Sequence, residues 1–293
     1  MSERCSVAAR ARGDELAGTA TRVSSFLLVE DAGPWGEVAL RDSRLPDDVA
    51  AWLRAQAEAT RVRILLIRRP GRTTRTRPRV FAVRSGQWCE RAELDRIDDV
   101  TTLDVAALAA GRSVGLEPWG EPLVLVCTHG RHDACCAERG RPLAAELGQI
   151  EPGRVWECSH LGGDRFAGNV LVLPEGLGFG RVDVAAAARL LADLDRGELD
   201  LDLLRGRCTL PMAAQYAEVQ LRRELAEVRD DALRCTSLRR VDGLMRVAFE
   251  REGTTYDVSV RTVPGPPATL TCRAAGTNPV PRHEIMSVTT PAG

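Results

Sequence analysis

The sequence predicts an α/β protein, and three observations support this prediction. Short apolar runs typical of buried strands alternate with amphipathic helical segments along most of the chain. The apolar run at 122–127 is followed by a helix-forming stretch at 133–148, which is how a strand–helix–strand unit begins. From residue 238 onward the pattern changes to the alternation that is typical of antiparallel strands.

The N-terminal part, residues 1–110, is expected to form a small α/β unit that starts with a loose leader of helical tendency. The expected elements are a strand at 24–30, a helix at 45–59, strands at 62–69 and 79–85, and a strand end running into a short helix at 100–111. A loop rich in Pro and Arg is expected at 70–78, between the second and third strands.

Residues 111–235 are expected to form a thioredoxin-like domain with a long trailing helix, followed by a small antiparallel sheet and a tail at 236–293. After the first strand and helix, the expected elements are strands at 154–160, 169–176 and 178–182 and helices at 183–197 and 210–233. The order strand, helix, strand, hairpin, helix is that of a thioredoxin-like layer. A diverged duplication would account for the two α/β units, although no repeat is visible residue by residue.

The bulk composition is ordinary for a globular protein and points to neither a nucleic-acid nor a membrane partner. The chain has 293 residues, of which 44% are hydrophobic and 28% charged, and its net charge is −1. No apolar run is long enough for a membrane span, and no secretory signal is visible. We therefore expect a cytoplasmic protein, in which the nine cysteines are more typical of a metal or redox site than of disulfides. The oligomeric state stays open.

Sulfur and imidazole side chains gather between Cys127 and His160. Such soft ligands suit zinc or an iron–sulfur centre better than a hard cation. Cys127 ends a predicted strand, and Cys136 follows after eight residues in the first turns of a predicted helix, where the thiolate form is favoured. Cys135 should point about 100° away from Cys136, so at most one of the pair is expected to be a ligand. The alternative is that these cysteines are small packed core residues.

A second element, ECSHLGGDRFAGN, supplies the other candidates. His160 ends a predicted strand, and Asp164 follows four residues later. Gly162 and Gly163 permit a tight turn in which the backbone approaches a ligand closely, so both are candidate cofactor contacts. Arg165 is a third candidate contact, as part of a cationic rim that would steer an anionic partner.

Together the two elements resemble the sucrase/ferredoxin-like family, a group of thioredoxin-like ferredoxins. The resemblance covers roughly residues 18–225 and includes the C-x8-C spacing, the SH-x-GG turn, RFAGN, LP-x-G and GRV. It implies a thioredoxin-like ferredoxin domain with a [2Fe–2S] cluster held by two cysteines and by two histidines of an H-x3-H turn. On this chain it implies Cys127, Cys136 and His160 as ligands, with position 164 as the fourth.

Position 164 departs from that pattern because it holds Asp rather than His. Asp164 could ligate iron through its carboxylate. Alternatively, Cys158, which shares a strand face with His160, could take the fourth place. In a third interpretation the cluster is absent and only the fold is retained. An anionic ligand in place of imidazole would lower the reduction potential below that of a bis-histidine relative.

We expect an electron carrier or reductase component rather than a hydrolase, because no carboxylate pair stands in a glycosidase-like context. The expected partners are an electron-donor protein or reductase and, as acceptor, a partner enzyme or a small anionic or ferric chelate. The alternative function is a non-redox binding module in which the same residues hold a structural zinc ion. A thiol oxidoreductase ranks last, since the chain has no C-x-x-C motif.

Overall fold

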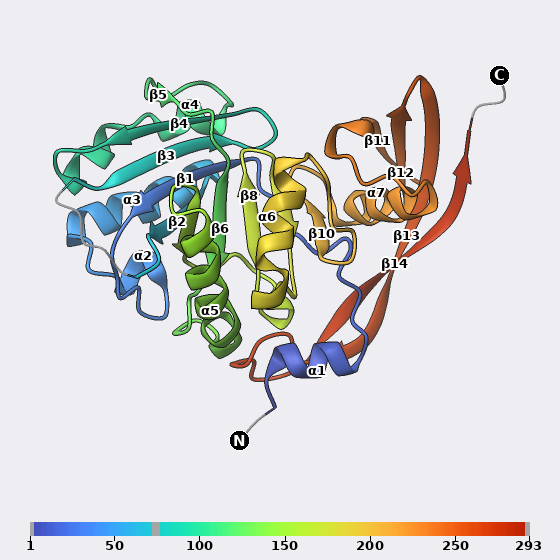
Figure 1. Cartoon of the computed structure of the whole chain (residues 1–293), viewed down its shortest axis with the longest axis horizontal. Coiled ribbons are helices and arrows are strands. Elements are labelled where there is room, and N and C mark those ends of the chain that lie inside the picture. The colour runs from blue at the N-terminus through green and yellow to red at the C-terminus, as the bar shows by residue number, and fades with distance from the viewer. Residues whose placement is uncertain (1–2, 72–76, 291–293) are drawn as a thin grey trace.

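The molecule consists of a curled ten-stranded sheet with helices packed on it and a separate four-stranded antiparallel sheet (Figure 1). This computed structural model describes residues 3–71 and 77–290. It confirms the predicted α/β class and the small antiparallel sheet near the C-terminus. Among the described residues, no helix combines the length and the apolar character that a membrane crossing requires.

The first half of the large sheet contains the predicted strands and helices, together with short elements that the sequence does not predict. Its elements are β1 (Ser25–Glu30), α2 (Ala39–Asp42), α3 (Asp47–Thr60), β2 (Arg63–Arg68), β3 (Arg79–Arg84), β4 (Trp88–Glu93), the 3-10 helix η1 (Ile97–Thr102), α4 (Val105–Ala109) and β5 (Glu117–Pro118). The strand end expected near residue 100 is wrong, because η1 occupies these residues. β4 is not predicted, since WCERAE carries too few apolar residues to resemble a buried strand. Most of the loop expected at 70–78 lies outside the described residues.

The second half contains every predicted element of the thioredoxin-like layer. Its elements are β6 (Leu123–Cys127), α5 (Ala134–Ile150), β7 (Val155–Cys158), the 3-10 helix η2 (Asp164–Phe166), β8 (Val170–Leu173), β9 (Leu177–Phe179), the 3-10 helix η3 (Val184–Ala186), α6 (Ala187–Asp195) and β10 (Leu204–Arg207). The order across the whole sheet is β10-β9-β8-β6-β7-β2-β1-β3-β4-β5.

The two halves of the large sheet share one topology. β1 pairs in parallel with β2 and antiparallel with β3, just as β6 pairs with β7 and β8. This repeated order is what a duplication would leave. The halves join where β2 pairs antiparallel with β7. There the buried Arg68 and Glu157 form an ion pair at 2.6 Å, and the Thr128 hydroxyl donates to the same carboxylate oxygen at 2.8 Å.

Side chains alternate between the two faces of the large sheet, as strand geometry requires. Val124 and Val126 of β6 pack on the outer face with residues of α5 and α6. Leu125 and Cys127 of the same strand face an inner core that also contains Trp156 of β7. The end of β6 therefore delivers the Cys127 sulfur to the interior of the curled sheet.

The C-terminal region packs on one helix and sends a long hairpin back to the start of the chain. Its elements are α7 (Met212–Glu224), the 3-10 helix η4 (Asp230–Ala232), β11 (Arg234–Val241), β12 (Leu244–Arg251), β13 (Thr254–Ala268) and β14 (Asn278–Thr289). The helix predicted to reach residue 233 stops at Glu224, because Ala226 adopts a left-handed φ of 49°. The alternating pattern of ATLTCRA (268–274) also predicts a strand of the small sheet, and this prediction is wrong. Beyond Ala268 these residues lie in the loop at the tip of the β13–β14 hairpin, near α1 (Cys5–Ala11) (Figure 1).

Candidate metal centre

The first turn of α5 carries two neighbouring cysteines, Cys135 and Cys136, whose side chains point into different parts of the protein. Asp133 caps this helix, and its carboxylate accepts a hydrogen bond from the Cys135 amide at 2.8 Å. Cys136 turns into the inner core beside Cys127. Cys135 turns away, into a separate small cluster with Cys5. The two sulfurs diverge, as adjacent helical positions must.

Cys127, Cys136 and His160 converge from three different elements. Their potential ligand atoms all lie within 4.8 Å of one another. Cys127 comes from the end of β6, Cys136 from α5 and His160 from the segment after β7. The two thiols are only 1% exposed, whereas the His160 side chain retains 24% exposure. The group therefore has a buried sulfur end and a histidine end that reaches solvent.

A second group overlaps the first through His160. The ligand atoms of His132, His160 and Asp164 also lie within 4.8 Å of one another. Asp164 Oδ1 lies 3.0 Å from His160 Nδ1 and accepts a hydrogen bond from Cys136 Sγ at 3.3 Å. The His132 and His160 rings are 3.8 Å apart between centroids. Sequence reasoning missed His132, although its place between the two cysteines of the C-x8-C element was a signal.

Cys158 lies beside Cys127 but belongs to neither group. The two residues are register partners in the parallel β6–β7 pair, and Cys158 is fully buried in the inner core. This burial raises the pKa of the Cys158 thiol well above its usual value. Asp164, by contrast, contacts both Cys136 and His160. The geometry therefore favours Asp164 over Cys158 as the fourth ligand.

The charges in the group suit a cation. A hydrogen bond from Cys136 lowers the pKa of the Cys127 thiol well below its usual value, against the opposing effect of burial. Burial alone would lower the pKa of His160, but Asp164 and the Cys127 thiolate raise it to about 9. For Asp164 burial acts in the opposite direction and would raise the pKa, yet the contact with His160 brings the pKa of this carboxyl below its usual value. A metal ion would replace protons held by this anionic set.

Comparison with known proteins identifies the family. A family model described as sucrase/ferredoxin-like matches residues 16–206, which include every residue of both overlapping groups. The chain belongs to the sucrase/ferredoxin-like family. Neither a curated protein nor a solved structure matches it. The matched residues end at β10, so the C-terminal helix and sheet of this family member lie outside them.

The glycine turn of this sucrase/ferredoxin-like protein is shaped around a buried arginine. Gly162 and Gly163 have φ values of 92° and 80°, which other residues rarely adopt. Arg205 donates to the Gly162 carbonyl at 3.0 Å and to the Asn169 side chain at 2.8 Å. Burial lowers the pKa of Arg205 to about 10, so it stays charged at neutral pH, close to Asp164. Sequence reasoning missed this buried cation, which no local pattern marks.

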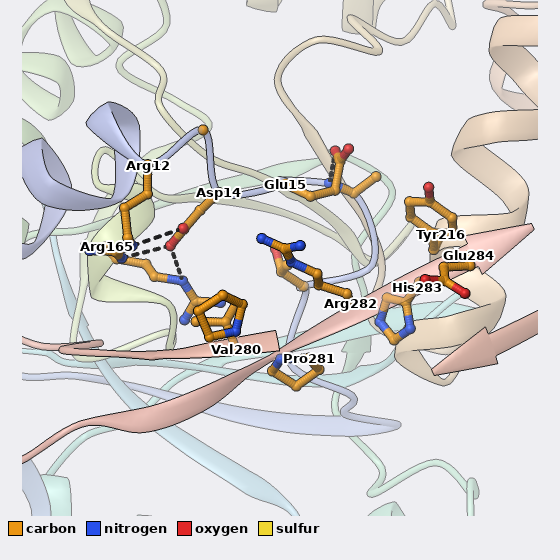
Figure 2. A pocket seen from close by; sticks show the side chains of 14 residues that line it. Arg12, Asp14, Glu15, Arg165, Tyr216, Val280, Pro281, Arg282, His283 and Glu284 are labelled. Atoms are coloured by element: carbon orange, nitrogen blue, oxygen red, sulfur yellow. Dashed lines mark hydrogen bonds and ion pairs between the residues drawn. The ribbon is translucent and has the colours of Figure 1, made fainter. Parts of the chain in front are cut away.

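Arg165 lines a pocket together with Arg12 and Asp14 (Figure 2). Its Nε atom is 3.4 Å from a carboxylate oxygen of Asp14, and its guanidinium stacks on the Phe166 ring. The pocket that it lines lies between the N-terminal segment, α7 and β14, where Tyr216 and His283 also face it. Among the described residues that line this pocket there is no cysteine, so the pocket is distinct from the candidate metal groups.

Proposed function

We propose that this sucrase/ferredoxin-like protein is an electron carrier that holds a [2Fe–2S] cluster. The observation that carries the proposal is the overlap of the two ligand groups. One end offers two thiols, from Cys127 and Cys136, and the other offers His160 with Asp164. A dinuclear cluster takes two protein ligands at each iron, and mixed thiolate and imidazole ligation is known for such clusters.

The surroundings of the ligands suit this cofactor. Such a cluster would supply one-electron chemistry. Cys127 and Cys136 are shielded by the inner core, which protects the sulfur end from solvent. His160 and His132 are only half-buried, so we place electron exchange with partners at the histidine end. The Arg205 charge offsets the negative charge of the thiolates and of Asp164. The proposed partners are an electron-donor protein or reductase and an acceptor enzyme or small ferric chelate.

His132 competes with Asp164 for the fourth ligand position. The potential ligand atoms of both side chains lie within 4.8 Å of a ring nitrogen of His160. Asp164 is favoured because it also touches Cys136, at 3.3 Å. With Asp164 as ligand, His132 would serve as the ring that packs on His160 and limits water at the exposed end. With His132 as ligand, Asp164 would instead orient His160 through its Nδ1 atom.

The test is anaerobic purification of the full chain with iron, sulfide and EPR analysis. We expect about two irons and two sulfides per chain and a visible absorption that dithionite bleaches. Cys136→Ala should abolish both signals, whereas Cys235→Ala, which changes a cysteine in the C-terminal sheet, should leave them intact. Loss of the EPR signal in only one of Asp164→Ala and His132→Ala would assign the fourth ligand.

A structural zinc ion is the second candidate. Asp164 Oδ1 lies 3.0 Å from His160 Nδ1 and 3.3 Å from Cys136 Sγ, which is close enough for all three to meet one tetrahedral ion. A colourless anaerobic preparation that contains zinc at this site, lost in Cys136→Ala, would support zinc and contradict the cluster.

A further inference from the structure

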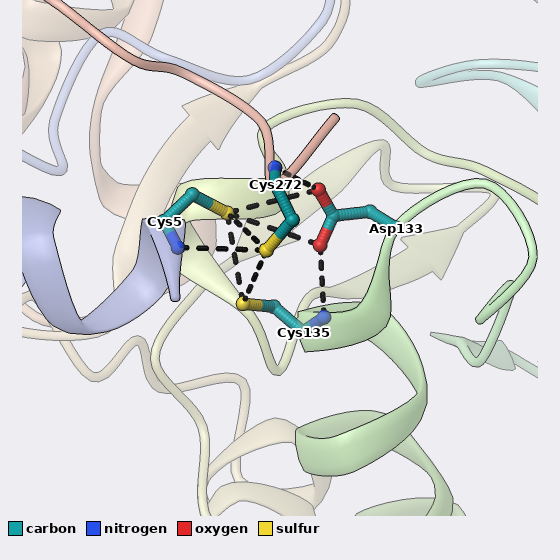
Figure 3. A group of neighbouring side chains, drawn as sticks. All are labelled: Cys5, Asp133, Cys135 and Cys272. Carbon is teal, nitrogen blue, oxygen red and sulfur yellow. Dashed lines mark hydrogen bonds between the residues drawn. The ribbon is translucent and has the colours of Figure 1, made fainter. Parts of the chain in front are cut away.

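A second group of cysteines lies on the other side of the first turn of α5. It consists of Cys5, Asp133, Cys135 and Cys272, whose potential ligand atoms all lie within 4.8 Å of one another (Figure 3). Cys5 is the first residue of α1, Cys135 belongs to α5, and Cys272 lies in the loop at the tip of the β13–β14 hairpin. We propose that this group is a structural zinc site that ties α1 and the tip of the β13–β14 hairpin to α5.

The sulfur positions are those of a single tetrahedral ion. The Sγ–Sγ distances are 3.6 Å for Cys5–Cys135, 3.3 Å for Cys135–Cys272 and 3.5 Å for Cys5–Cys272. Three thiolates at a Zn–S distance of about 2.3 Å lie about 3.8 Å apart. A small outward shift of the sulfurs would therefore accommodate the ion. Cys5 and Cys135 are 2% and 1% exposed, so the ion would be sealed from solvent on that side.

Asp133 supplies the fourth ligand. Its carboxylate is fully buried, and its two oxygens lie 3.8 Å and 3.7 Å from Cys5 Sγ. One oxygen accepts the Cys135 amide at 2.8 Å, and the other accepts the Cys272 amide at 2.6 Å. Each carboxylate oxygen has a second lone pair, which leaves capacity for a metal bond. These amide contacts would orient the carboxylate in the way that outer hydrogen bonds orient metal ligands.

The sulfurs are also placed as hydrogen-bond acceptors. The Ser6 hydroxyl donates to Cys135 Sγ at 3.2 Å, and the Cys5 amide donates to Cys272 Sγ at 3.5 Å. Donors aimed at sulfur are what thiolate ligands require. Three thiolates and a carboxylate around Zn²⁺ leave a net negative charge, which the guanidinium of Arg4 lies near enough to offset.

Apolar packing is too small to hold these segments by itself. Among the described residues, the buried cluster at this point contains only Cys5, Cys135 and Ala167, with the partly buried Cys272 packed against it. Two polar contacts outside the group are exposed: Arg4 pairs with Glu138, and Arg273 donates to the Arg131 carbonyl at 2.9 Å. Pairs of that kind contribute about 0–1 kcal/mol in general. A metal ion with ligands from three segments is the chemistry that would hold them together.

The site can be tested independently of the proposed iron–sulfur cluster. Metal content is measured in the Cys136→Ser protein, which lacks one thiol of the proposed cluster. The zinc that this protein loses when Cys5 or Cys272 is also changed belongs to the second site, because neither residue is in the first. We expect about one zinc per chain. Adding Cys5→Ser or Cys272→Ser should reduce zinc at least about tenfold, with circular dichroism verifying the fold. Cys235→Ser, which changes a partly exposed cysteine outside the group, is the matched control and should retain it.

A measurement on the unmodified chain guards against variants that fail to fold. Protein purified from cobalt-supplemented cells should show the thiolate-to-cobalt charge-transfer absorption of a tetrahedral Cys-rich site. This absorption should be retained in the Cys136→Ser protein, because Cys136 is not in this group. A Cys135–Cys272 disulfide found by mass spectrometry would overturn the proposal. So would three free thiols without metal, iron in place of zinc, or equal zinc in the Cys272→Ser protein. Absence of iron at the first centre, with zinc still present here, would contradict only the cluster.

Discussion

Two groups of potential metal ligands flank the first turn of α5, and they join different parts of the chain. The inner group consists of Cys127, Cys136, His160, His132 and Asp164, and the outer group of Cys5, Asp133, Cys135 and Cys272. The inner group draws its candidates from residues 127–164, all within the family match, and lies in the core of the curled sheet. The outer group needs Cys5 and Cys272, which lie outside that match and 267 residues apart. One short helical turn thus serves both groups, because Cys135 and Cys136 point in different directions. The inner group is suited to chemistry, and the outer group to holding an added region in place.

Replacing each of the two neighbouring cysteines, Cys135 and Cys136, by serine in separate proteins should give the largest effect on bound metal. Cys136→Ser is expected to abolish iron binding and to leave zinc in place, whereas Cys135→Ser should remove zinc and keep the iron signal. The physical reason is that each sulfur belongs to only one group. Metal analysis and EPR on both proteins measure this directly. If both variants lost both metals equally, the two groups would form one coupled centre and the comparison would fail.

The second prediction concerns the ion pairs that attach α7, in contrast to the zinc site that we propose at the hairpin tip. Glu218 is buried between Arg222 and Arg207 of β10, at 3.1 Å and 2.9 Å. Burial would raise the pKa of Glu218, but the two arginines bring it below the usual value. Removing one partner of a buried pair costs about 3–5 kcal/mol. We expect Glu218→Gln to lose about 3 kcal/mol of unfolding free energy at pH 7, measured by urea denaturation.

The pH dependence of this loss follows from the lowered pKa of Glu218. A lowered carboxyl pKa stabilises the fold fully above the unfolded value of about 4.3, and this stabilisation disappears as pH falls through the folded value. The difference between wild type and Glu218→Gln should therefore be constant near neutral pH and shrink below pH of about 4. A difference that stayed the same at pH 3 would show that the charge of Glu218 is not its origin. Glu224→Gln, at the exposed end of α7, is the matched control.

The third prediction sharpens the ligand assignment at the histidine end of the inner group. If Asp164 ligates iron, Asp164→His replaces an anionic ligand by a neutral one and should raise the reduction potential by on the order of 100 mV. The measurement is an EPR-monitored redox titration of both proteins. An unchanged or lower potential would exclude the carboxylate as a ligand. His132→Gln, measured in parallel, should then show the larger change.

The sequence predicts most of the large sheet because local patterns determine it. The run at 122–127, the C-x8-C spacing and the SH-x-GG turn are all short-range signals, and the inner candidates lie within forty residues of one another. The outer group escapes such reasoning, because Cys272 meets Cys135 only after the β13–β14 hairpin folds back across 137 residues. The stop of α7 at Glu224 escapes it too, since the apolar pattern continues through a residue with left-handed φ. Arg205 approaches the inner group only through tertiary contacts, whereas the position of His132 within the C-x8-C element was a signal that could have been used.

The smallest expected effect separates Cys158 from its register partner Cys127. Both sulfurs lie at the inner ends of paired strands and face the same core, so sequence alone cannot rank them. Cys158→Ala removes one buried atom and should cost about 1 kcal/mol of stability. Iron content and potential should stay unchanged, because the Cys158 sulfur lies outside both ligand groups. Cys127→Ala removes a similar volume and is the matched comparison, which should lose the iron entirely. If Cys158→Ala lost iron to the same extent, the fourth ligand would be Cys158, and Asp164 would be left as the ion-pair partner of His160.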